Sequence, residues 1–462
     1  MISLKEKKTI NNNTSIHKRC NSRFRRMLSA KRFFVFLSLI FLFFEPAGAI
    51  ARFPKPDFTQ GYQYPEIVHG VPWESFWSWM DLVLMCLLMG MVAWATHFRK
   101  SRRVIIGVSL VSVAYFGFYR TGCVCSIGSI QNVALALADG RNYTIPLVVL
   151  LLFLLPLLFA LFFGRVYCGG VCPMGALQEL VNIHNFRISR AVSWALGLIP
   201  WIYLAFAILY AATRSQFIIC KFDPFIGIFR LGGDIGMIVF GALLLILSVF
   251  VGRPFCRFLC PYGVLLGLMS SLAKRRVEVT SEKCINCTLC HHSCPVDAIR
   301  EPTSSNDKQT EKRNLGVKRI FLYILILPLL TISGALLLQS QSERLSLAHR
   351  DVWLYEQLQS QNNVSGSFNL SPEVEAFHEM GRDPEELQTS VLSVRKSYRI
   401  WSAIAGGLIG FVLGCKLIRL STKRTRKTYE TEASSCVACG RCFNYCPQNL
   451  KKPITKDETK PL

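Results

Sequence analysis

Long apolar runs constrain this chain more than any other feature, because only helices and closed barrels can cross a lipid bilayer. A crossing helix needs about 20 mostly apolar residues. Hydrophobic residues make up 51% of the 462 residues and charged residues only 18%, whereas a soluble domain has about 25% charged residues. The sequence therefore predicts an α-helical polytopic membrane protein. Its about seven spans are expected at 77–97, 104–120, 145–163, 192–212, 235–251, 318–338 and 400–418.

The N-terminal residues have the features of a secretory signal. A basic segment precedes an apolar run, Phe33–Phe44, and small residues follow at Ala47-Gly48-Ala49. This order is typical of a signal peptide with its cleavage site, although an uncleaved anchor would explain the same residues. We therefore expect residues 1–49 to be a signal peptide or N-terminal anchor, followed by an extracytoplasmic segment at residues 50–76.

Basic loops predict the orientation in the membrane. Lys and Arg number 53 against 29 Asp and Glu, a net charge of +24, and the cytoplasmic loops of membrane proteins carry such an excess. The predicted spans place four basic clusters on one side, at residues 99–103, 274–276, 312–313 and 423–427. We expect a multi-pass protein of the bacterial inner membrane whose loops 121–144, 213–234 and 339–399 face outward. The last loop is predicted to be helical, either as a cap over the membrane domain or as a partner surface.

Two cysteine motifs share the spacing C-x2-C-x2-C-x3-C-P. The first comprises Cys284, Cys287, Cys290 and Cys294, and the second comprises Cys436, Cys439, Cys442 and Cys446. This is the bacterial ferredoxin run, whose thiolates bind [4Fe–4S] clusters and whose fourth cysteine ligates the other cluster. Residues 275–310 and 428–462 are therefore predicted to be the two halves of a small α+β ferredoxin-like domain that holds two clusters.

The predicted spans 318–338 and 400–418 separate the two halves. Because two spans return the chain to its starting side, both halves are expected in the cytoplasm, where they can combine. We expect one cluster to be held by Cys284, Cys287, Cys290 and Cys446, and the other by Cys436, Cys439, Cys442 and Cys294. The alternative is two independent clusters, each held by the four cysteines of its own motif.

The membrane domain, residues 77–274, contains an internal repeat. Cys168, Cys172 and Pro173 recur as Cys256, Cys260 and Pro261, an offset of 256 − 168 = 88 residues, and Gly-Arg precedes each copy. Glycine and proline turns at the end of a span let the backbone approach a bulky group. The four thiols therefore suggest a third redox site, an iron–sulfur cluster or a soft metal. The alternative is that they are structural thiols.

The outward loops contain further thiols. Cys123 and Cys125 lie in one loop and Cys220 in the next, and the segment from Cys125 to Gln131 resembles the segment from Cys172 to Gln178. In an oxidising compartment a disulfide between Cys220 and Cys123 or Cys125 is expected, and a redox relay is the alternative. A relay has a physical argument behind it, because electrons do not usefully cross a hydrocarbon slab of about 30 Å in one step.

Several other cofactors and ligands are not expected. Cys287-Thr-Leu-Cys290-His291 fits the C-x-x-C-H of c-type haem attachment, but haem is attached outside the cytoplasm. No G-x-G-x-x-G opens a helix after a strand, so no nucleotide fold is predicted. The basic clusters lack interleaved aromatic residues of the kind that bind nucleic acid.

The two C-x3-C-P motifs followed by two ferredoxin motifs resemble the NapH/NosR-type family of membrane ferredoxin proteins, over about residues 77–300 and 430–450. The outward Gly122-Cys123-Val-Cys125 and Cys220-x-x-Asp223-Pro224 segments are similar to the NosR branch. The resemblance implies clusters on the eight ferredoxin cysteines. It also implies electron transfer between the quinol pool and periplasmic reductases or their maturation. The Ser/Thr-Gly-Ala-Thr flavin motif of that branch does not occur, so the N-terminal flavin domain is expected to be lacking.

We therefore predict a membrane-bound iron–sulfur electron carrier that works with the bilayer, the quinone pool and an unidentified redox partner. Whether it oxidises quinol itself, as an oxidoreductase subunit, stays open at this point. One alternative is an assembly factor that reduces a metal or thiol for a metalloenzyme. Another is a redox-sensing membrane regulator in which the clusters report the redox state.

Overall fold

A computed structural model describes residues 75–122, 124–140, 143–183, 186–279, 287–302, 313–362, 374, 377, 383–421, 426 and 428–446. The predicted signal or anchor, Cys123 and Cys284 lie outside these residues. The helices and the sheet all belong to one of two compact units, which comprises residues 58–139 and 145–462.

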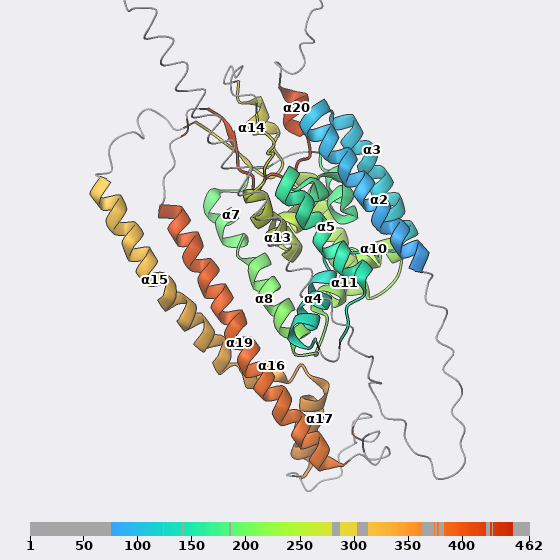
Figure 1. Cartoon of the computed structure of the whole chain (residues 1–462), viewed down its shortest axis with the longest axis vertical. Helices are drawn as coiled ribbons and strands as arrows, with labels where there is room; N and C mark the ends of the chain where they lie inside the picture. The colour runs from blue at the N-terminus through green and yellow to red at the C-terminus, as the bar shows by residue number, and fades with distance from the viewer. Residues whose placement is uncertain are drawn as a thin grey trace, which may run out of the picture. The chain divides into compact units, whose positions relative to one another are not determined.

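The described part of the chain is almost entirely helical (Figure 1). Its first elements are α2 (Ser75–Trp94), η1 (Ala95–Arg99), α3 (Arg102–Ser112), η2 (Val113–Tyr119), α4 (Ser129–Ala138), α5 (Leu147–Phe163), η3 (Tyr167–Val171) and α6 (Pro173–Val181). Next come α7 (Arg190–Leu196), α8 (Ile199–Ala212), α9 (Ile218–Lys221), α10 (Ile226–Arg230), α11 (Ile235–Phe250), α12 (Pro254–Phe258) and α13 (Pro261–Ser271). The last are α14 (Leu289–Ser293), β1 (Ile299–Arg300), α15 (Arg313–Ser340), α16 (Ser342–Ser346), α17 (Arg350–Asn362), α19 (Pro384–Ser421), β2 (Glu430–Thr431) and α20 (Arg441–Tyr445).

Five helical segments are long and apolar enough to cross a membrane, at Phe76–Arg99, Arg102–Tyr119, Ala191–Ala212, Tyr323–Ser340 and Pro384–Leu420. The other two predicted spans form α5 and α11, which are apolar but have only 17 and 16 residues. At 1.5 Å per residue these helices are about 25 Å long, slightly less than the hydrocarbon core of about 30 Å. The membrane character that the sequence predicts is therefore confirmed. Of the roughly seven predicted spans, five are long enough to cross the bilayer.

Helix α5 lies against α2, α4 and α13 in the core of the membrane domain. Its sequence, LVVLLLFLLPLLFALFF, is apolar on every face, as expected for a helix surrounded by other helices or lipid. Gly164 ends α5 with a φ of 76°, a conformation that glycine adopts without steric strain. The chain then enters the turn that carries the first C-x3-C-P motif.

Helices α15 and α19 form a tightly packed hairpin and run side by side in Figure 1. Glycines make this close approach possible. A Cβ on Gly406 would collide with the carbonyl of Gly334, and a Cβ on Gly410 would collide with the carbonyl of Leu330. Such small-residue contacts replace the hydrophobic effect as the packing force inside a bilayer.

The two ferredoxin halves form one small domain at the end of this hairpin. Strand β1 pairs with β2 in antiparallel register, with Ile299 opposite Thr431 and Arg300 opposite Glu430. Helix α14 of the first half packs against α20 of the second. The hairpin thus brings together two segments that are far apart in the sequence.

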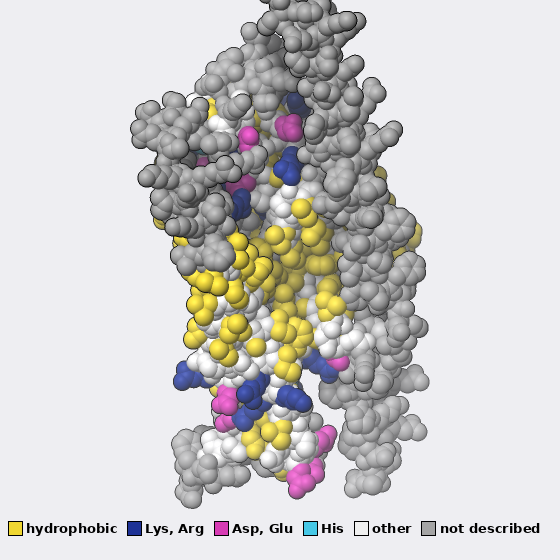
Figure 2. Space-filling view, turned by 60° about the vertical axis from the view of Figure 1, so that its left-hand side comes forward, with side chains coloured by type: hydrophobic (Ala, Val, Ile, Leu, Met, Phe, Trp, Pro, Cys, Tyr) yellow, Lys and Arg dark blue, Asp and Glu magenta, His cyan; other side chains and the backbone are white. Residues whose placement is uncertain are grey.

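The predicted outward loop 339–399 is helical where it is described. Val352 and Leu354 of α17 share a small core with Leu387 and Val391 of α19. No glycine or proline interrupts α19 between Pro384 and Ala405, so the predicted outer segment and the predicted span continue as one helix of 38 residues. Figure 2 shows hydrophobic side chains gathered in a band on one face, with charged side chains beyond it at both ends, as a bilayer requires.

Candidate iron–sulfur sites

The described ferredoxin cysteines gather around two short helices in contact with each other. Cys287, Cys290 and Cys294 lie at and beside α14, and Cys436, Cys439, Cys442 and Cys446 lie at and beside α20. Cys290 belongs to a small core with Ile299 and Tyr429, and Cys294 and Cys442 pack against it. The structure therefore brings the two motifs together, while Cys284 lies outside the described residues.

Cys294 of the first motif lies among the cysteines of the second. Burial raises the pKa of Cys436 to about 11, and the neighbouring charge of Cys294 contributes to this shift. Burial likewise raises the pKa of Cys442 well above its usual value, with further contributions from Cys436, Cys439 and Cys294. Buried thiolates that raise one another's pKa values are stable only when a positive centre compensates them. Their chemistry therefore fits a metal cluster, and both Cys290 and Cys294 of the first motif lie near Cys442 of the second.

The four C-x3-C-P cysteines line a single small cavity. This group, called the quartet below, comprises Cys168, Cys172, Cys256 and Cys260, and Tyr167 and Tyr262 complete the wall. The cavity is embedded in the protein, because Cys168, Cys172 and Cys260 are each less than 8% exposed.

Hydrogen-bond donors surround the quartet sulfurs. The backbone N–H of Gly263 donates to Sγ of Cys260 over 3.3 Å, and that of Gly175 donates to Cys172. The side chains of Arg165 and Gln178 donate to Sγ of Cys168 and of Cys256, each over 3.6 Å. Donors of this kind stabilise thiolates and tune the potential of thiolate-bound clusters.

No group of three or more His, Cys, Asp or Glu side chains in the described segments lies close enough to hold a single metal ion. A cubane of four irons is wider than one ion and needs its ligands further apart. Four cysteine thiols around one cavity suit either of the two occupants that the sequence left open, an iron–sulfur cluster or a soft metal.

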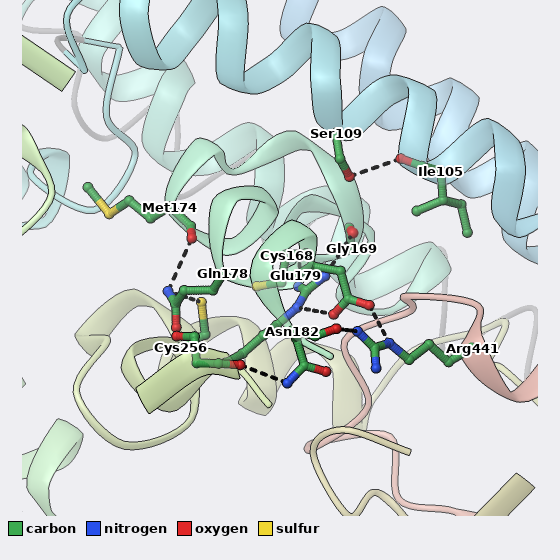
Figure 3. A network of polar contacts seen from close by, with 12 residues as sticks. Ile105, Ser109, Cys168, Gly169, Met174, Gln178, Glu179, Asn182, Cys256 and Arg441 are labelled. Atoms are coloured by element: carbon green, nitrogen blue, oxygen red, sulfur yellow. Dashed lines mark hydrogen bonds and ion pairs between the residues drawn. The ribbon is translucent and has the colours of Figure 1, made fainter. Parts of the chain in front are cut away.

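Glu179 of α6 joins the quartet to the ferredoxin domain, as Figure 3 shows. Its carboxylate accepts hydrogen bonds from Arg253 Nε over 3.0 Å, from Arg441 Nε over 2.6 Å and from Arg102 Nη2 over 3.3 Å. Arg253 is fully buried and also donates to the carbonyls of Cys168 and Gly169. Burial alone would raise the pKa of Glu179, but the charges of Arg253, Arg441 and Arg102 hold it below its usual value.

The motifs did not single out Glu179, Arg253 or Arg165. A signal was present, because Gly-Arg precedes each C-x3-C-P pair at the same distance, as Gly164-Arg165 and Gly252-Arg253. Because the surrounding residues are apolar, arginines at these positions indicate buried partners. The identity of the partner, Glu179, depends on tertiary packing.

A second and larger cavity, of about 850 Å³, adjoins the quartet. Cys256 and Cys260 form part of its wall, together with Trp194, Trp201 and Arg257. Three buried N–H groups around it have no hydrogen-bond partner among the described residues: Arg165 Nε, Trp194 Nε1 and Arg257 Nη1. Buried donors without partners destabilise a protein, so they indicate an acceptor that binds in this cavity.

The outward thiols also come together. Cys125 and Cys220 are free thiols, and a Cβ on Gly128 would lie 3.2 Å from the sulfur of Cys220. Burial and the neighbouring charges of Asp223 and Cys220 raise the pKa of Cys125 to about 12. Cys123, the third predicted outward thiol, lies outside the described residues.

Comparisons with known proteins agree with these sites. A family model described as a 4Fe-4S binding domain matches residues 145–191 and 234–280, which contain the quartet, and a second model of the same description matches residues 277–300. No solved structure matches.

Three curated relatives cover parts of the chain. Regulatory protein NosR of Pseudomonas aeruginosa is 29% identical over 44% of this chain and 30% of its own length. Putative electron transport protein YccM of Escherichia coli is 27% identical over 37% of this chain and 52% of its own length. Ferredoxin-type protein NapH of Escherichia coli is 28% identical over 31% of this chain and 51% of its own length.

The chain thus spans about half or less of the length of these relatives. Its iron–sulfur and membrane character agrees with the sequence predictions. As the paired cysteine motifs predicted, the chain is related to the NapH/NosR-type membrane ferredoxin proteins.

Proposed function

We propose that this chain is a membrane-bound electron carrier that takes electrons from quinol and passes them through three [4Fe–4S] clusters to a respiratory reductase or its maturation system. The observation that carries the proposal is the junction at Glu179, which fixes the quartet directly against the second ferredoxin motif. A Cβ on Gly169, next to Cys168, would lie 3.1 Å from the carbonyls of both Val437 and Ala438. Neighbouring redox sites at such close packing allow electrons to pass between them.

We assign the ligand sets from the ferredoxin spacing, and the proximity of Cys294 to the second motif supports the exchange. The first cluster is assigned to Cys284, Cys287, Cys290 and Cys446, the second to Cys436, Cys439, Cys442 and Cys294, and the third to the quartet. When bound, these clusters supply one-electron redox chemistry. The protein positions the sulfurs, excludes water through burial, and offsets the negative charge of the thiolates with Arg165 and Arg253.

The cavity of about 850 Å³ is the proposed quinol site. Aromatic walls at Trp194 and Trp201 suit the flat ring of a quinol, and the free N–H groups of Arg165, Trp194 and Arg257 suit its oxygens. Contact with Cys256 and Cys260 would let the ring pass its electrons to the quartet. The protons released on oxidation would leave towards the charged residues Asp297 and Glu432 on the cavity wall.

We place the ferredoxin halves on the cytoplasmic face of the bacterial inner membrane. Arg102 supports this orientation, because it lies in the basic loop 99–103 and bonds to the same carboxylate as Arg441 of the second ferredoxin half. This strongly basic loop and the ferredoxin domain therefore share one end of the span Arg102–Tyr119. A positive loop indicates the cytoplasmic side.

Anaerobic purification with iron analysis and EPR tests the proposal. At least about twelve irons per chain are expected, and a quinol analogue such as duroquinol should reduce the clusters. In Cys446→Ser the cluster of Cys284, Cys287 and Cys290 should lose its normal signal, while Cys415→Ser, which changes an exposed lone cysteine, should behave like the unsubstituted protein. If Cys446→Ser alters only the cluster of its own motif, the exchanged ligand sets are wrong. If duroquinol reduces nothing, the quinol role is wrong.

A metal- or thiol-reducing assembly factor is the second candidate function. The proximity of Cys125 to the exposed Cys220 favours it, since an accessible thiol pair could deliver electrons to a partner's metal or disulfide. Quinol-dependent reduction of copper(II) that disappears in Cys220→Ser would support this candidate. Retention of the full rate in Cys220→Ser would exclude it.

A further inference from the structure

The outward loop at Cys125 repeats the hydrogen-bond pattern of the quartet. The backbone N–H of Gly128 donates to Sγ of Cys125 over 3.5 Å. In the quartet, the N–H of Gly263 donates in the same way to Sγ of Cys260, three residues before it. In both places a cysteine lies directly before a turn or helix, and a glycine N–H is directed at its sulfur.

A buried glutamine extends the match. Gln178 Oε1 accepts a hydrogen bond from the backbone N–H of Phe255 over 3.1 Å, and the next residue is Cys256 of the quartet. Gln131 Oε1 accepts one from the N–H of Ile219 over 3.0 Å, and the next residue is Cys220. Both glutamines are 0% exposed. Each amide oxygen therefore holds the backbone next to a cysteine of another segment.

The two glutamines differ in one respect. Nε2 of Gln178 has acceptors, namely Sγ of Cys256 over 3.6 Å and the carbonyl of Met174 over 3.1 Å. Nε2 of Gln131 is buried and has no hydrogen-bond partner among the residues that the structure describes. An unpartnered buried amide is destabilising, and the equivalent amide in the quartet serves a thiolate. The outward site therefore lacks an acceptor at the place where the quartet has one.

Asp223 occupies the position of the quartet's last cysteine. Asp223-Pro224 follows Cys220 as Cys260-Pro261 follows Cys256, with one residue fewer between them. Asp223 is 7% exposed, and its Oδ1 accepts the N–H of Phe225 over 2.9 Å. Carboxylate and thiolate are both ligands of iron, so replacing a cysteine by an aspartate at this position keeps a ligand in place.

We propose that Cys125, Cys220 and Asp223 bind a further iron–sulfur cluster at the opposite end of the membrane domain from the ferredoxin halves. This inference rests on the proposed function, since it adds a redox site at the outward end of the same electron-transfer chain. Gly128 is required for the site, since a side chain there would meet the sulfur of Cys220 at 3.2 Å.

The outward site shares a wall with the quartet. Ile127, two residues from Cys125, lines the quartet cavity together with Tyr167 and Tyr262. The rings of these tyrosines touch edge to face, with centroids 6.1 Å apart. The quartet therefore lies between the outward site and the ferredoxin domain, which divides the crossing of the bilayer into shorter steps. Cys220 is exposed, so a cluster at this position would face a partner.

Iron analysis and EPR of the full-length chain, purified anaerobically in detergent, test the inference. Cys220→Ser and Asp223→Ala should each lose about four irons per chain and one EPR signal. Asp223→Cys should keep its iron but shift the g-values of that signal, because a thiolate would replace the carboxylate ligand. The matched control is Cys415→Ser, which changes an exposed thiol of α19 and should leave both measurements unchanged.

Two results would overturn the inference: an unchanged iron content in Cys220→Ser, or an EPR spectrum of Asp223→Cys that equals that of the unsubstituted protein. The ferredoxin signals serve as the internal check on folding, since they must persist in every variant compared. The proposed function fails separately, when Cys256→Ser loses no iron. If Cys256→Ser loses iron and Cys220→Ser does not, the outward cluster is rejected and the proposed function stands.

Discussion

Arg441 donates from Nε to Oε1 of Glu179 over 2.6 Å, although the two residues are 262 positions apart in the chain. Glu179 lies in the membrane domain and Arg441 begins the short helix of the second ferredoxin motif. Both side chains are less than 10% exposed. One buried carboxylate therefore holds the ferredoxin domain against the quartet.

Glu179→Gln should destabilise the protein by about 3 kcal/mol, because removing one partner leaves buried arginine charges uncompensated. The measurement is thermal unfolding in detergent, together with EPR of the coupling between clusters, which should weaken as the ferredoxin domain separates. Glu356→Gln is the control, since Glu356 pairs with Arg395 at the surface and is 44% exposed. That variant should change stability by at most about 1 kcal/mol. Equal effects in the two variants would contradict the special role of Glu179.

Stability should fall in acid in a way that depends on Glu179. The arginines hold its pKa in the folded state below the ordinary value of 4.5, so the charged carboxylate stabilises the fold. That contribution is complete above the unfolded-state pKa and is lost as the pH falls through the lower folded-state pKa. Unfolding midpoints measured from pH 7 down to pH 3 should decline below about pH 4.5 in the unsubstituted protein. In Glu179→Gln this part of the decline should be absent, and an identical pH profile would contradict the assignment.

Gly406→Ala should open the hairpin of α15 and α19. The added methyl group would collide with the backbone of Gly334, and overpacking of this kind costs about 1–3 kcal/mol. Iron bound by the ferredoxin cysteines should fall, because the two halves would no longer be held together. Gly407→Ala provides the matched control at the next residue, where the new methyl group meets no atom closer than 3.8 Å. If both variants bind iron equally well, hairpin packing does not assemble the ferredoxin domain.

Arg165→Met should lower the reduction potential of the quartet cluster. The variant removes a buried positive charge and an N–H donor to Sγ of Cys168, both of which favour the more negative, reduced state. A tenfold change in a one-electron equilibrium corresponds to about 59 mV, and a decrease of that order is expected. Potentiometric titration monitored by EPR measures it, and Arg165→Lys, which keeps the charge, should show a smaller decrease. An increased potential in Arg165→Met would contradict the assigned role.

Trp194→Phe should weaken the use of quinol. The substitution keeps an aromatic wall in the larger cavity and removes one free N–H donor. Loss of one such hydrogen bond is worth about 1 kcal/mol, so KM for duroquinol should rise about fivefold, with little change in kcat. Trp77→Phe, on the exposed side of α2, controls for the change of residue type. An unchanged KM in Trp194→Phe would place quinol elsewhere.

Patterns that depend on local sequence predicted much of this architecture. Apolar runs located the long spans, and the cysteine spacings located both ferredoxin motifs and the quartet, since each is set by contiguous residues. Counting the spans between the two halves predicted that they lie on one side of the membrane, where they can combine. The structure adds the pairing of β1 with β2 and the proximity of Cys294 to the second motif.

Other features depend on contacts between distant residues and left a weaker signal. The three ion pairs of Glu179 join residues that are 74 to 262 positions apart, so no local spacing could reveal them. The predicted spans at 145–163 and 235–251 form slightly shorter helices, because α5 begins only after Pro146 and an extended residue, Val251, ends α11. The cavity beside Trp194 arises between elements far apart in sequence and has no motif of its own.

The antiparallel pairing of β1 with β2 determines when the ferredoxin domain can assemble during synthesis. During translation, the first ferredoxin half leaves the ribosome well before its strand partner, and α15 and α19 must be inserted in between. Until the final segment has been synthesised, α14 lacks the packing of α20. In the proposed ligand sets neither ferredoxin cluster has its four cysteines before then, so iron would be loaded only after the polypeptide is complete.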